Sequence, residues 1–511
     1  MKYLAIIASI IFCIAACTRT KDTFKKPNIL FAISDDQSYP HAGIYGYDAV
    51  ATPNFDRIAN EGVLFNNAFS AAPGCSPSRA SILTGRHIWQ LENAGTHASE
   101  FPAKYICYTD ILEEAGYHVG YTAKGWGPGN WKVSGRTRNP AGDEYSELID
   151  ENVPQFIRNT DYAANFDAFL NDRQPDQPFC FWYGASEPHR RYQTGIGVEN
   201  GIDINKIRVP SFLPDVENVR SDMADYLYEI QHFDIHLGRM VNKLEEIGEL
   251  ENTLIVVTSD NGMPFPRAKA NNYEYGFHMP LAVRWGNETK GGRIVDDLIS
   301  LTDLAPTFLE AAGVSHPATE SGEFPMIGKS IINILKNDQS GLVDTSRTAI
   351  YSGRERHSSS RWNNLTYPIR AIRTTEYLYI KNFKPERWPA GAPEKYGNDN
   401  QLEPGYHDID DFTENFIYLN RDDETIKKYF DLAVAKRSEE ELFNIKNDPG
   451  CLLNLAEDDN YEEVLIFHRN QLEKRLIETQ DPRVMGKGDI WEEYIRYSPI
   501  RKFPEPDWLT N

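Results

Sequence analysis

Two acidic motifs far apart in the chain could together bind a hard divalent cation. Asp35 and Asp36 directly follow one apolar run, and Asp260 and Asn261 directly follow another. Three carboxylates and an amide oxygen, with no soft ligand beside them, suit calcium or magnesium better than zinc. Taken alone, each pair is more often a turn or a helix cap than a set of ligands. The prediction of a cation site therefore depends on the two motifs meeting in space.

The segment Cys75-Ser76-Pro77-Ser78-Arg79-Ala80 holds the most specific pattern in the chain. It matches the Cys-x-Pro-x-Arg signature of the type I sulfatases, and the chain resembles this family over nearly all of its length. In that family a maturation enzyme oxidises the cysteine to formylglycine. The resemblance implies a sulfatase with formylglycine at Cys75 and with the formylglycine-generating enzyme as a partner. The alternative is an unmodified structural cysteine, which the two acidic motifs disfavour.

The resemblance also assigns a role to each further position that matches the family. One calcium ion would be bound by Asp35, Asp36, Asp260 and Asn261. The catalytic positions would be Cys75, Arg79, Lys124, His189 and Lys269. Formylglycine hydrate offers a hydroxyl that attacks sulfur, lysines stabilise charged oxygens, and a histidine with an ordinary pKa of about 6.5 can protonate the leaving group. Taken singly, the lysines and the histidine would be interpreted as solvated or structural side chains.

The chain departs from the family pattern beside Lys124. Many sulfatases have Lys-x-His at this point, whereas this chain has Lys124-Gly125-Trp126 and so lacks the proton-accepting histidine. We hypothesise that His97 enters the pocket and substitutes for it. A substrate contact or a structural role for His97 is the alternative.

Within the family, the chain is most similar to the sulfamidases, the heparan N-sulfatases. The similar stretches include 187–190, 259–266, 367–370 and 478–482. This narrower resemblance implies that the substrate is N-sulfoglucosamine at the end of a glycan. An O-sulfated sugar of another glycan is the alternative, because likeness of fold does not fix specificity.

A charged segment precedes strands of the predicted second domain. It consists of Arg354, Glu355, Arg356 and His357. Arginine suits planar anions, so these side chains could reach over the pocket and bind a carboxylate or the hydroxyls of a sugar. A surface charge cluster is an equally good interpretation of the same residues.

Two other classes of protein compete with a sulfatase. Phosphatases and phosphodiesterases of the alkaline phosphatase superfamily share the sheet, but they typically combine a serine or threonine nucleophile with two zinc ions. A catalytically inactive glycan-binding lipoprotein is the second rival. It is disfavoured because Cys75, Pro77, Arg79 and the four candidate cation ligands are all present.

Apolar runs that alternate with helical patterns predict an α/β fold. The runs 29–33, 179–183 and 254–258 are typical of buried parallel strands, and residues 221–248 and 301–312 have helical spacing. Polar groups that follow such strands gather at the carboxyl edge of the sheet, where ligands bind. The family resemblance implies an alkaline-phosphatase-like α/β/α sandwich with a large mixed sheet. We expect a catalytic domain over 27–340 and an α+β subdomain with a small antiparallel sheet and a terminal helix over 341–511.

The first residues have the pattern of a bacterial lipoprotein signal. A short apolar run ends in Ile14-Ala15-Ala16-Cys17, so residues 1–17 are expected to be a signal peptide that leads to a lipidated Cys17. The protein would then be anchored to a membrane of the bacterial cell envelope, in the periplasm or on the outer membrane. An ordinary cleaved signal is the alternative. The net charge of -22 argues against a nucleic-acid partner.

Overall fold

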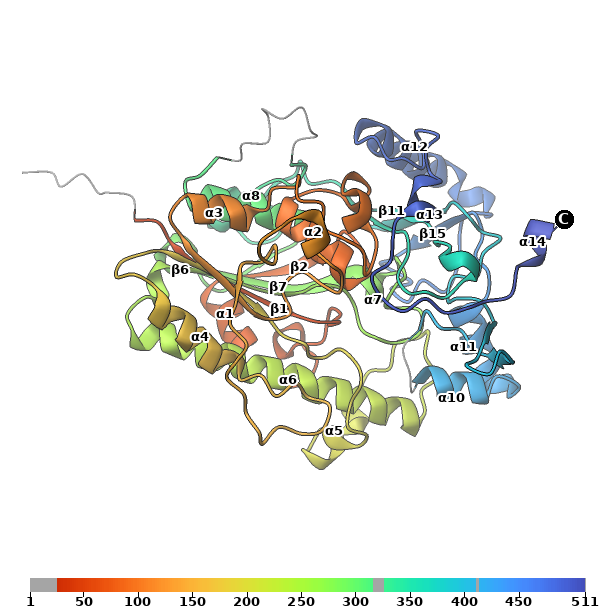
Figure 1. Cartoon of the computed structure of the whole chain (residues 1–511), viewed down its shortest axis with the longest axis horizontal. Helices are drawn as coiled ribbons and strands as arrows, with labels where there is room; N and C mark the ends of the chain where they lie inside the picture. Colours follow the sequence, from red (N-terminus) through yellow and green to blue (C-terminus); the bar gives the residue numbers. More distant parts are fainter. Residues whose placement is uncertain (1–24, 316–325, 410–412, 511) are drawn as a thin grey trace, which may run out of the picture.

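The computed structural model describes residues 25–315, 326–409 and 413–510 (Figure 1). The predicted signal peptide and Cys17 lie outside the described residues. Among the residues that are described, no helix is both long and apolar enough to cross a membrane.

A mixed sheet forms the centre of the larger part of the molecule. In the described residues its strands follow the order β4-β3-β5-β1-β6-β7-β2-β8, and β9 pairs with β2. Their bounds are β1 Asn28–Ser34, β2 Val63–Phe69, β3 His118–Ala123, β4 Asp143–Glu144, β5 Phe179–Gly184, β6 Thr253–Ser259, β7 His278–Trp285, β8 Arg293–Val295 and β9 Ile299–Ser300. β1 is parallel to both β5 and β6, whereas β7 is antiparallel to its neighbours β6 and β2. The three predicted buried strands are therefore confirmed as adjacent central strands.

Helices cover both faces of this sheet, as Figure 1 shows. One face carries α2 (Cys75–Thr84), α3 (Tyr108–Glu114) and α8 (Leu304–Ala311), and the other carries α1 (Pro53–Glu61), α4 (Tyr162–Asp172) and α6 (Glu217–Glu246). Successive side chains of a strand point to opposite faces, so a strand that is covered on both sides must be apolar throughout. This arrangement confirms the predicted α/β/α sandwich.

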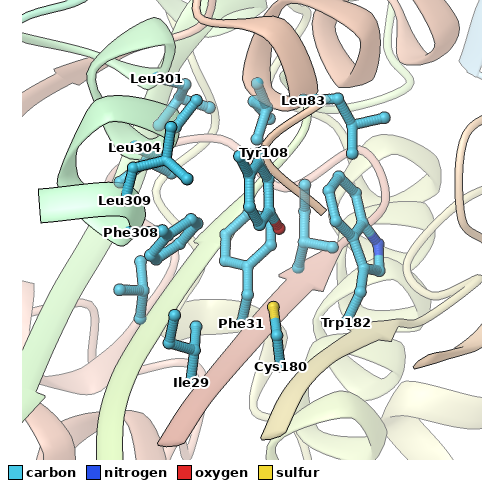
Figure 2. Close-up of a cluster of buried hydrophobic side chains, with 14 of the residues drawn as sticks. Ile29, Phe31, Leu83, Tyr108, Cys180, Trp182, Leu301, Leu304, Phe308 and Leu309 are labelled. Atoms are coloured by element: carbon cyan, nitrogen blue, oxygen red, sulfur yellow. The ribbon is translucent and has the colours of Figure 1, made fainter. Parts of the chain in front are cut away.

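The alternation along β1 shows how both layers are filled. Phe31 points into the layer of α3 and α8, where its ring meets Trp182 edge-on with the centroids 4.8 Å apart (Figure 2). The next side chain, Ala32, points into the opposite layer and packs with residues of α4 and α6. Burial of such side chains stabilises the fold by about 25 cal/mol per Å² of apolar surface. This core holds the strands in place, and so it fixes the edge of the sheet from which the polar residues project.

A second, antiparallel sheet lies beside the first. Its strands are β10 Ile350–Arg354, β11 Ile369–Arg373, β12 Tyr377–Asn382 and β15 Glu440–Asn444, and α12 (Glu462–Glu478) packs against it. Its core is continuous with the first domain, because Phe69 and Phe277 pack among Ile369 and Phe443. Gly341 still pairs with β8 of the large sheet, so the small sheet itself begins only at Ile350.

The remaining α-helices and strands of the described residues are mostly short. They are α5 Ile196–Glu199, α7 Glu274–Phe277, α9 Ile332–Leu335, β13 Glu394–Tyr396, β14 Leu402–Pro404, α10 Thr413–Leu419, α11 Glu424–Val434, α13 Ile490–Glu493 and α14 Asp507–Thr510.

Candidate active site

The two acidic motifs meet because β1 and β6 are neighbouring parallel strands. The register pairs Ser34 with Ser259, so both strands end at the same level. The Asp260 amide donates to the Ser34 carbonyl over 3.2 Å, and the Asp36 amide donates to Asp260 Oδ1, also over 3.2 Å. The register of two strands thus joins residues that are widely separated in the chain.

The four candidate cation ligands are buried together. Single ligand atoms of Asp35, Asp36 and Cys75 lie within 4.8 Å of one another. Asn261 donates to Asp36 Oδ1 over 2.6 Å, while its own Oδ1 is buried without a hydrogen-bond partner. A buried acceptor without a partner is costly, and clustered carboxylates repel one another unless a cation compensates them. The donor set and the free amide oxygen fit a hard divalent cation.

Cys75 begins the helix that follows the turn at Gly74. Its Sγ lies 3.5 Å from Asp35 Oδ1, and the side chain is 1% exposed. Burial raises the pKa of the unmodified thiol, with Lys124 acting in the opposite direction. An unmodified cysteine at this position would therefore be a poor nucleophile, because the thiolate is the reactive form.

Arg79 lies one helical turn after Cys75 and so on the same face of α2. Its Nε donates to Asp260 Oδ2 over 2.7 Å, and its Nη1 donates to the carbonyl of Lys124 over 2.6 Å. The remaining Nη2 is buried without a partner. Arg79 therefore joins α2 to the ends of β6 and β3, and it keeps one donor available for an anion.

Three further candidate side chains surround the two aspartates. Lys124 forms an ion pair with Asp35, and Lys269 Nζ lies 2.6 Å from Asp36 Oδ2. Burial raises the pKa of Asp35, but the nearby positive charges, Lys124 foremost, outweigh it and hold that pKa below its usual value. His189 Nε2 lies 3.9 Å from Asp36 Oδ2. The structure thus brings all nine predicted catalytic and cation-binding residues to one edge of the large sheet.

The ring of His189 is oriented by its own backbone. Its Nδ1 lies 2.7 Å from the Arg190 carbonyl, which can only accept, so Nδ1 bears the proton and Nε2 faces the site. The side chain is 37% exposed, whereas those of Lys124, Lys269 and Arg79 are at most 18% exposed.

Trp126 fills the position where a histidine was missing from the pattern. The indole is 3% exposed, packs edge-on against Phe101 and donates from Nε1 to the Ser76 carbonyl over 3.0 Å. It therefore supports the first turn of α2. His97 lies in a turn close to this end of α2, because the amide of its neighbour Ala98 donates to Ser76 Oγ over 3.2 Å. Burial lowers the pKa of His97 well below its usual value, so its ring is neutral.

The charged segment at the end of β10 lies in the interior, which corrects both interpretations of Arg354, Glu355 and Arg356. Arg354 pairs with Asp408, Glu355 accepts from Arg370 and Arg483 over 2.7 Å each, and Arg356 donates to the Tyr494 carbonyl. All three residues are at most 4% exposed. Arg354 and Glu355 thus have charged partners inside the protein, whereas Arg356 has only a backbone carbonyl, and burial lowers its pKa to about 10. The local sequence could not reveal these partners, because most of them lie far away in the chain.

His357 is the member of that segment that approaches the candidate nucleophile. Its Nδ1 lies 3.1 Å from Asp408 Oδ1, and its ring is 4.7 Å from that of His97. A Cβ placed on Gly74, the residue before Cys75, would lie 3.3 Å from His357 Cδ2. The small domain therefore contributes a side chain beside the first turn of α2.

A hollow of about 430 Å³ opens onto this site. Asp35, Lys124 and His189 lie in its wall together with Phe156 and Glu229, for which the sequence predicted no role. Phe156 belongs to an irregular segment, and Glu229 is a buried residue in the middle of α6. Neither residue stands in a recognisable motif, so only their position in the fold identifies them.

Comparisons with known proteins agree with this geometry. A family model described as sulfatase matches residues 27–314, and one described as the C-terminal part of N-sulphoglucosamine sulphohydrolase matches residues 268–389. The N-sulphoglucosamine sulphohydrolase of Homo sapiens is 27% identical over 92% of this chain and 93% of its own length. An ulvan-active sulfatase of Formosa agariphila is 26% identical over 91% of this chain and 77% of its own length.

A solved structure supports the same fold. It is that of a protein in complex with its substrate D-glucosamine-2-N,6-O-disulfate, and the comparison gives a TM-score of 0.61 at 22% identity over 89% of this chain and 99% of the other. The sulfatase model spans more than half of the chain and includes both acidic motifs and Cys75. The predicted family and fold are therefore confirmed: this chain belongs to the sulfatase family, the hydrolases of sulfate esters and sulfamates.

Proposed function

We propose that the protein removes sulfate from the terminal sugar of a sulfated glycan, with formylglycine at position 75 and one calcium ion. The observation that supports this most directly is the distance of 3.5 Å between Cys75 Sγ and Asp35 Oδ1 at the buried junction of β1, β6 and α2. Nucleophile position, cation ligands and two lysines are contiguous there. Glycan binding without catalysis does not require a nucleophile position, cation ligands and lysines in contact with one another.

The side chains around position 75 divide the chemical work. Asp35, Asp36, Asp260 and Asn261 would hold the cation, which together with formylglycine supplies an activated oxygen nucleophile when both are present. Lys124 and Lys269 place positive charge beside the aspartates, where sulfate oxygens can replace a carboxylate partner. The Nε2 atom of His189 faces the same space and can hold the proton that the leaving group needs.

For the substrate we propose N-sulfoglucosamine at a glycan end. The support is the similarity to the human N-sulphoglucosamine sulphohydrolase and the match of residues 268–389 to the C-terminal model of that enzyme. An O-sulfated sugar is the second candidate. The ulvan-active sulfatase is similar over almost the same share of this chain, and Trp126 occupies a position that borders the substrate pocket.

We further propose that Cys17 is lipidated and anchors the enzyme to a membrane of the cell envelope. The sequence of the first residues supports this location, because a short apolar run ends in Ile14-Ala15-Ala16-Cys17. Membrane fractionation of the full chain and of Cys17→Ala tests the anchor. If Cys17→Ala remained in the membrane fraction, the lipoprotein assignment would be wrong.

The function itself is tested by sulfate release. The full chain is produced together with a formylglycine-generating enzyme and offered N-sulfoglucosamine beside a panel of O-sulfated sugars and short glycans. We expect release that is lost in Cys75→Ala, and a peptide mass that shows the aldehyde at position 75. Release from O-sulfated sugars alone would retain the mechanism and reject the sulfamidase specificity. No release by the aldehyde-bearing protein would contradict the proposed function.

A further inference from the structure

A separate hollow of about 250 Å³ lies between the large sheet and the small one. Its wall includes residues of β9, the start of β10, the carboxyl-terminal half of α12 and His87. The helix α2 has 10 residues and is about 15 Å long, with Cys75 at its first position and His87 just beyond its last. The hollow therefore adjoins the opposite end of α2 from the candidate nucleophile, and none of the functional residues named above lines it.

Arg475 is held in the wall of this hollow by uncharged groups. Its Nε donates to His87 Nε2 over 3.1 Å, and its guanidinium lies 5.4 Å from the centroid of the Tyr351 ring. Burial lowers the pKa of His87 well below its usual value, so that ring is neutral. Among the described residues, the two Nη atoms of Arg475 have no hydrogen bond or ion pair. Arginines that are removed from water are usually paired with an acid, so Arg475 presents a fixed pair of donors whose charge is not compensated.

The other arginine of the wall is already neutralised. Arg347 is 9% exposed, and its Nη1 donates to Asp303 Oδ2 over 2.7 Å. Its Nη2 donates to the carbonyls of Lys329 and Ser330. Asp303 also accepts the Lys329 amide over 2.7 Å. These contacts fix the backbone of Lys329 at the rim of the hollow, whereas its ammonium group has no partner in the described part of the chain.

The hollow as a whole has an excess of positive charge. Its wall contains the cationic side chains of Lys329, Arg347, Lys474 and Arg475 and the carboxylates of Asp303 and Glu478. Arg347 pairs with Asp303, and Lys474 lies 3.9 Å from Glu478. Arg475 and Lys329 remain, in a chain whose net charge is -22. Because a hollow with uncompensated cations concentrates the field of their charges, this one favours an anion.

The size and the polar groups of the hollow indicate a small oxyanion. Sites for organic ligands usually measure about 300–1,000 Å³, so this hollow suits an ion better than a chain of sugars. The hydroxyl of Thr348 and the amide of Gln471 are exposed in the same wall. A guanidinium group binds oxyanions through two parallel hydrogen bonds, and hydroxyl and amide groups can donate to the oxygens that remain.

We propose that this hollow binds a tetrahedral oxyanion, a sulfate or a phosphate group, between Arg475 and Lys329. The inference does not depend on the proposed function. Two sources share this chemistry: a free inorganic ion, and a sulfate group carried by a glycan. Because Arg475 contacts His87 just beyond the end of α2, the bound anion also strengthens the contact of α12 with the helix that begins at Cys75.

Calorimetric titration at constant ionic strength tests the site with three probes: sodium sulfate, sodium phosphate and a heparin octasaccharide. We expect Arg475→Gln to weaken binding about tenfold to hundredfold, because glutamine retains a donor for His87 but lacks the charge and the pair of Nη donors. Lys329→Gln should weaken it about twofold to fivefold. Lys329 is exposed, so this second variant is expected to fold normally. The candidate active site is intact in both variants, so only the binding that they lose reports on the hollow.

Arg469→Gln is the matched control. Arg469 lies on the same helix and is 41% exposed, but it pairs with Glu440 outside the hollow, so its replacement should leave every affinity unchanged. Weaker binding of the inorganic ions to Arg475→Gln supports a site for free ions. Weaker binding of the octasaccharide alone supports a site for sulfate groups on a glycan. Equal affinities of wild type and Arg475→Gln for all three probes, or an equal loss in Arg469→Gln, would overturn the inference.

Discussion

The Nε atom of Arg79 lies 2.7 Å from Asp260 Oδ2, and both side chains are fully buried. This ion pair connects the helix that begins with Cys75 to the end of β6. Desolvated pairs of this kind contribute little net stability compared with apolar residues, but the loss of one partner leaves an uncompensated buried charge. The pair therefore acts mainly to hold the candidate nucleophile Cys75 next to the candidate cation ligands.

Arg79→Ala is expected to destabilise the protein by about 3–5 kcal/mol, because Asp260 would remain buried without its partner. Urea unfolding measures this loss. Arg469→Ala removes an arginine that is 41% exposed from a surface pair with Glu440, and should cost at most about 1 kcal/mol. Similar losses for the two variants would show that the buried pair has no special role.

A divalent cation is expected to raise the unfolding temperature. Binding to the folded state alone stabilises it by about 2.7 kcal/mol when the free cation is a hundred times its dissociation constant. Calorimetric scans with calcium and with a chelator measure the shift. Asn261→Ala and Asp36→Asn should abolish it, whereas Cys75→Ala should retain part of it. A shift of equal size in Asn261→Ala would place the cation elsewhere.

Asp408 is expected to be essential for the fold of the small domain. It is buried and pairs with Arg354 and Arg361, and it also accepts from His357. Asp408→Ala would strand two buried guanidinium groups, so a loss of about 3–5 kcal/mol in unfolding free energy should follow. Asp459→Ala, at an exposed aspartate, is the control. A neutral result for Asp408→Ala would refute the structural role assigned to this segment.

His41 should make the protein less stable in acid. Burial lowers the pKa of its ring to about 3, with Arg208 as a smaller cause. Between pH 6.5 and 3 the unfolded chain binds a proton at this residue and the folded chain does not, so its contribution to stability is complete above pH 6.5 and declines as pH falls. The slope is about 1.4 kcal/mol per pH unit.

Comparison of wild type with His41→Phe isolates this contribution. Urea unfolding should show that the free energy of unfolding falls less between pH 7 and pH 5 in the variant than in the wild type, since phenylalanine cannot bind the proton. His41 also contacts the Tyr226 hydroxyl over 3.1 Å, so the variant is expected to lose some stability at both pH values. Only the change in the free energy of unfolding between pH 7 and pH 5 tests the prediction. An equal change in the wild type and in His41→Phe would contradict it.

His97→Ala tests whether this residue compensates for Trp126. If His97 transfers a proton, turnover should fall about 10²–10⁴-fold at saturating substrate. If it contacts the substrate only, KM should rise while kcat stays constant. Steady-state kinetics distinguish these outcomes, with the unfolding temperature as a check on the fold. Unchanged kinetics would remove His97 from the active site.

The sequence alone determined the chemistry of the site and the elements that present it. Cys75 and Arg79 lie four residues apart, so any helix places them on one face, and the apolar runs before Asp35 and Asp260 have the composition of buried strands. These are local properties, which follow from a few neighbouring residues. The family resemblance then predicted that the residues after these two strands bind one cation together.

Tertiary structure alone decided which charges are buried in ion pairs and which line the hollow at the candidate active site. Arg354 and Glu355 were expected on the surface or over the pocket, yet Asp408, Arg370 and Arg483 bury them. Phe156 has no motif, but the fold places it in the wall of that hollow. Glu355 and Arg483 are 128 positions apart and Arg354 and Asp408 are 54 apart, so local spacing cannot predict these pairs.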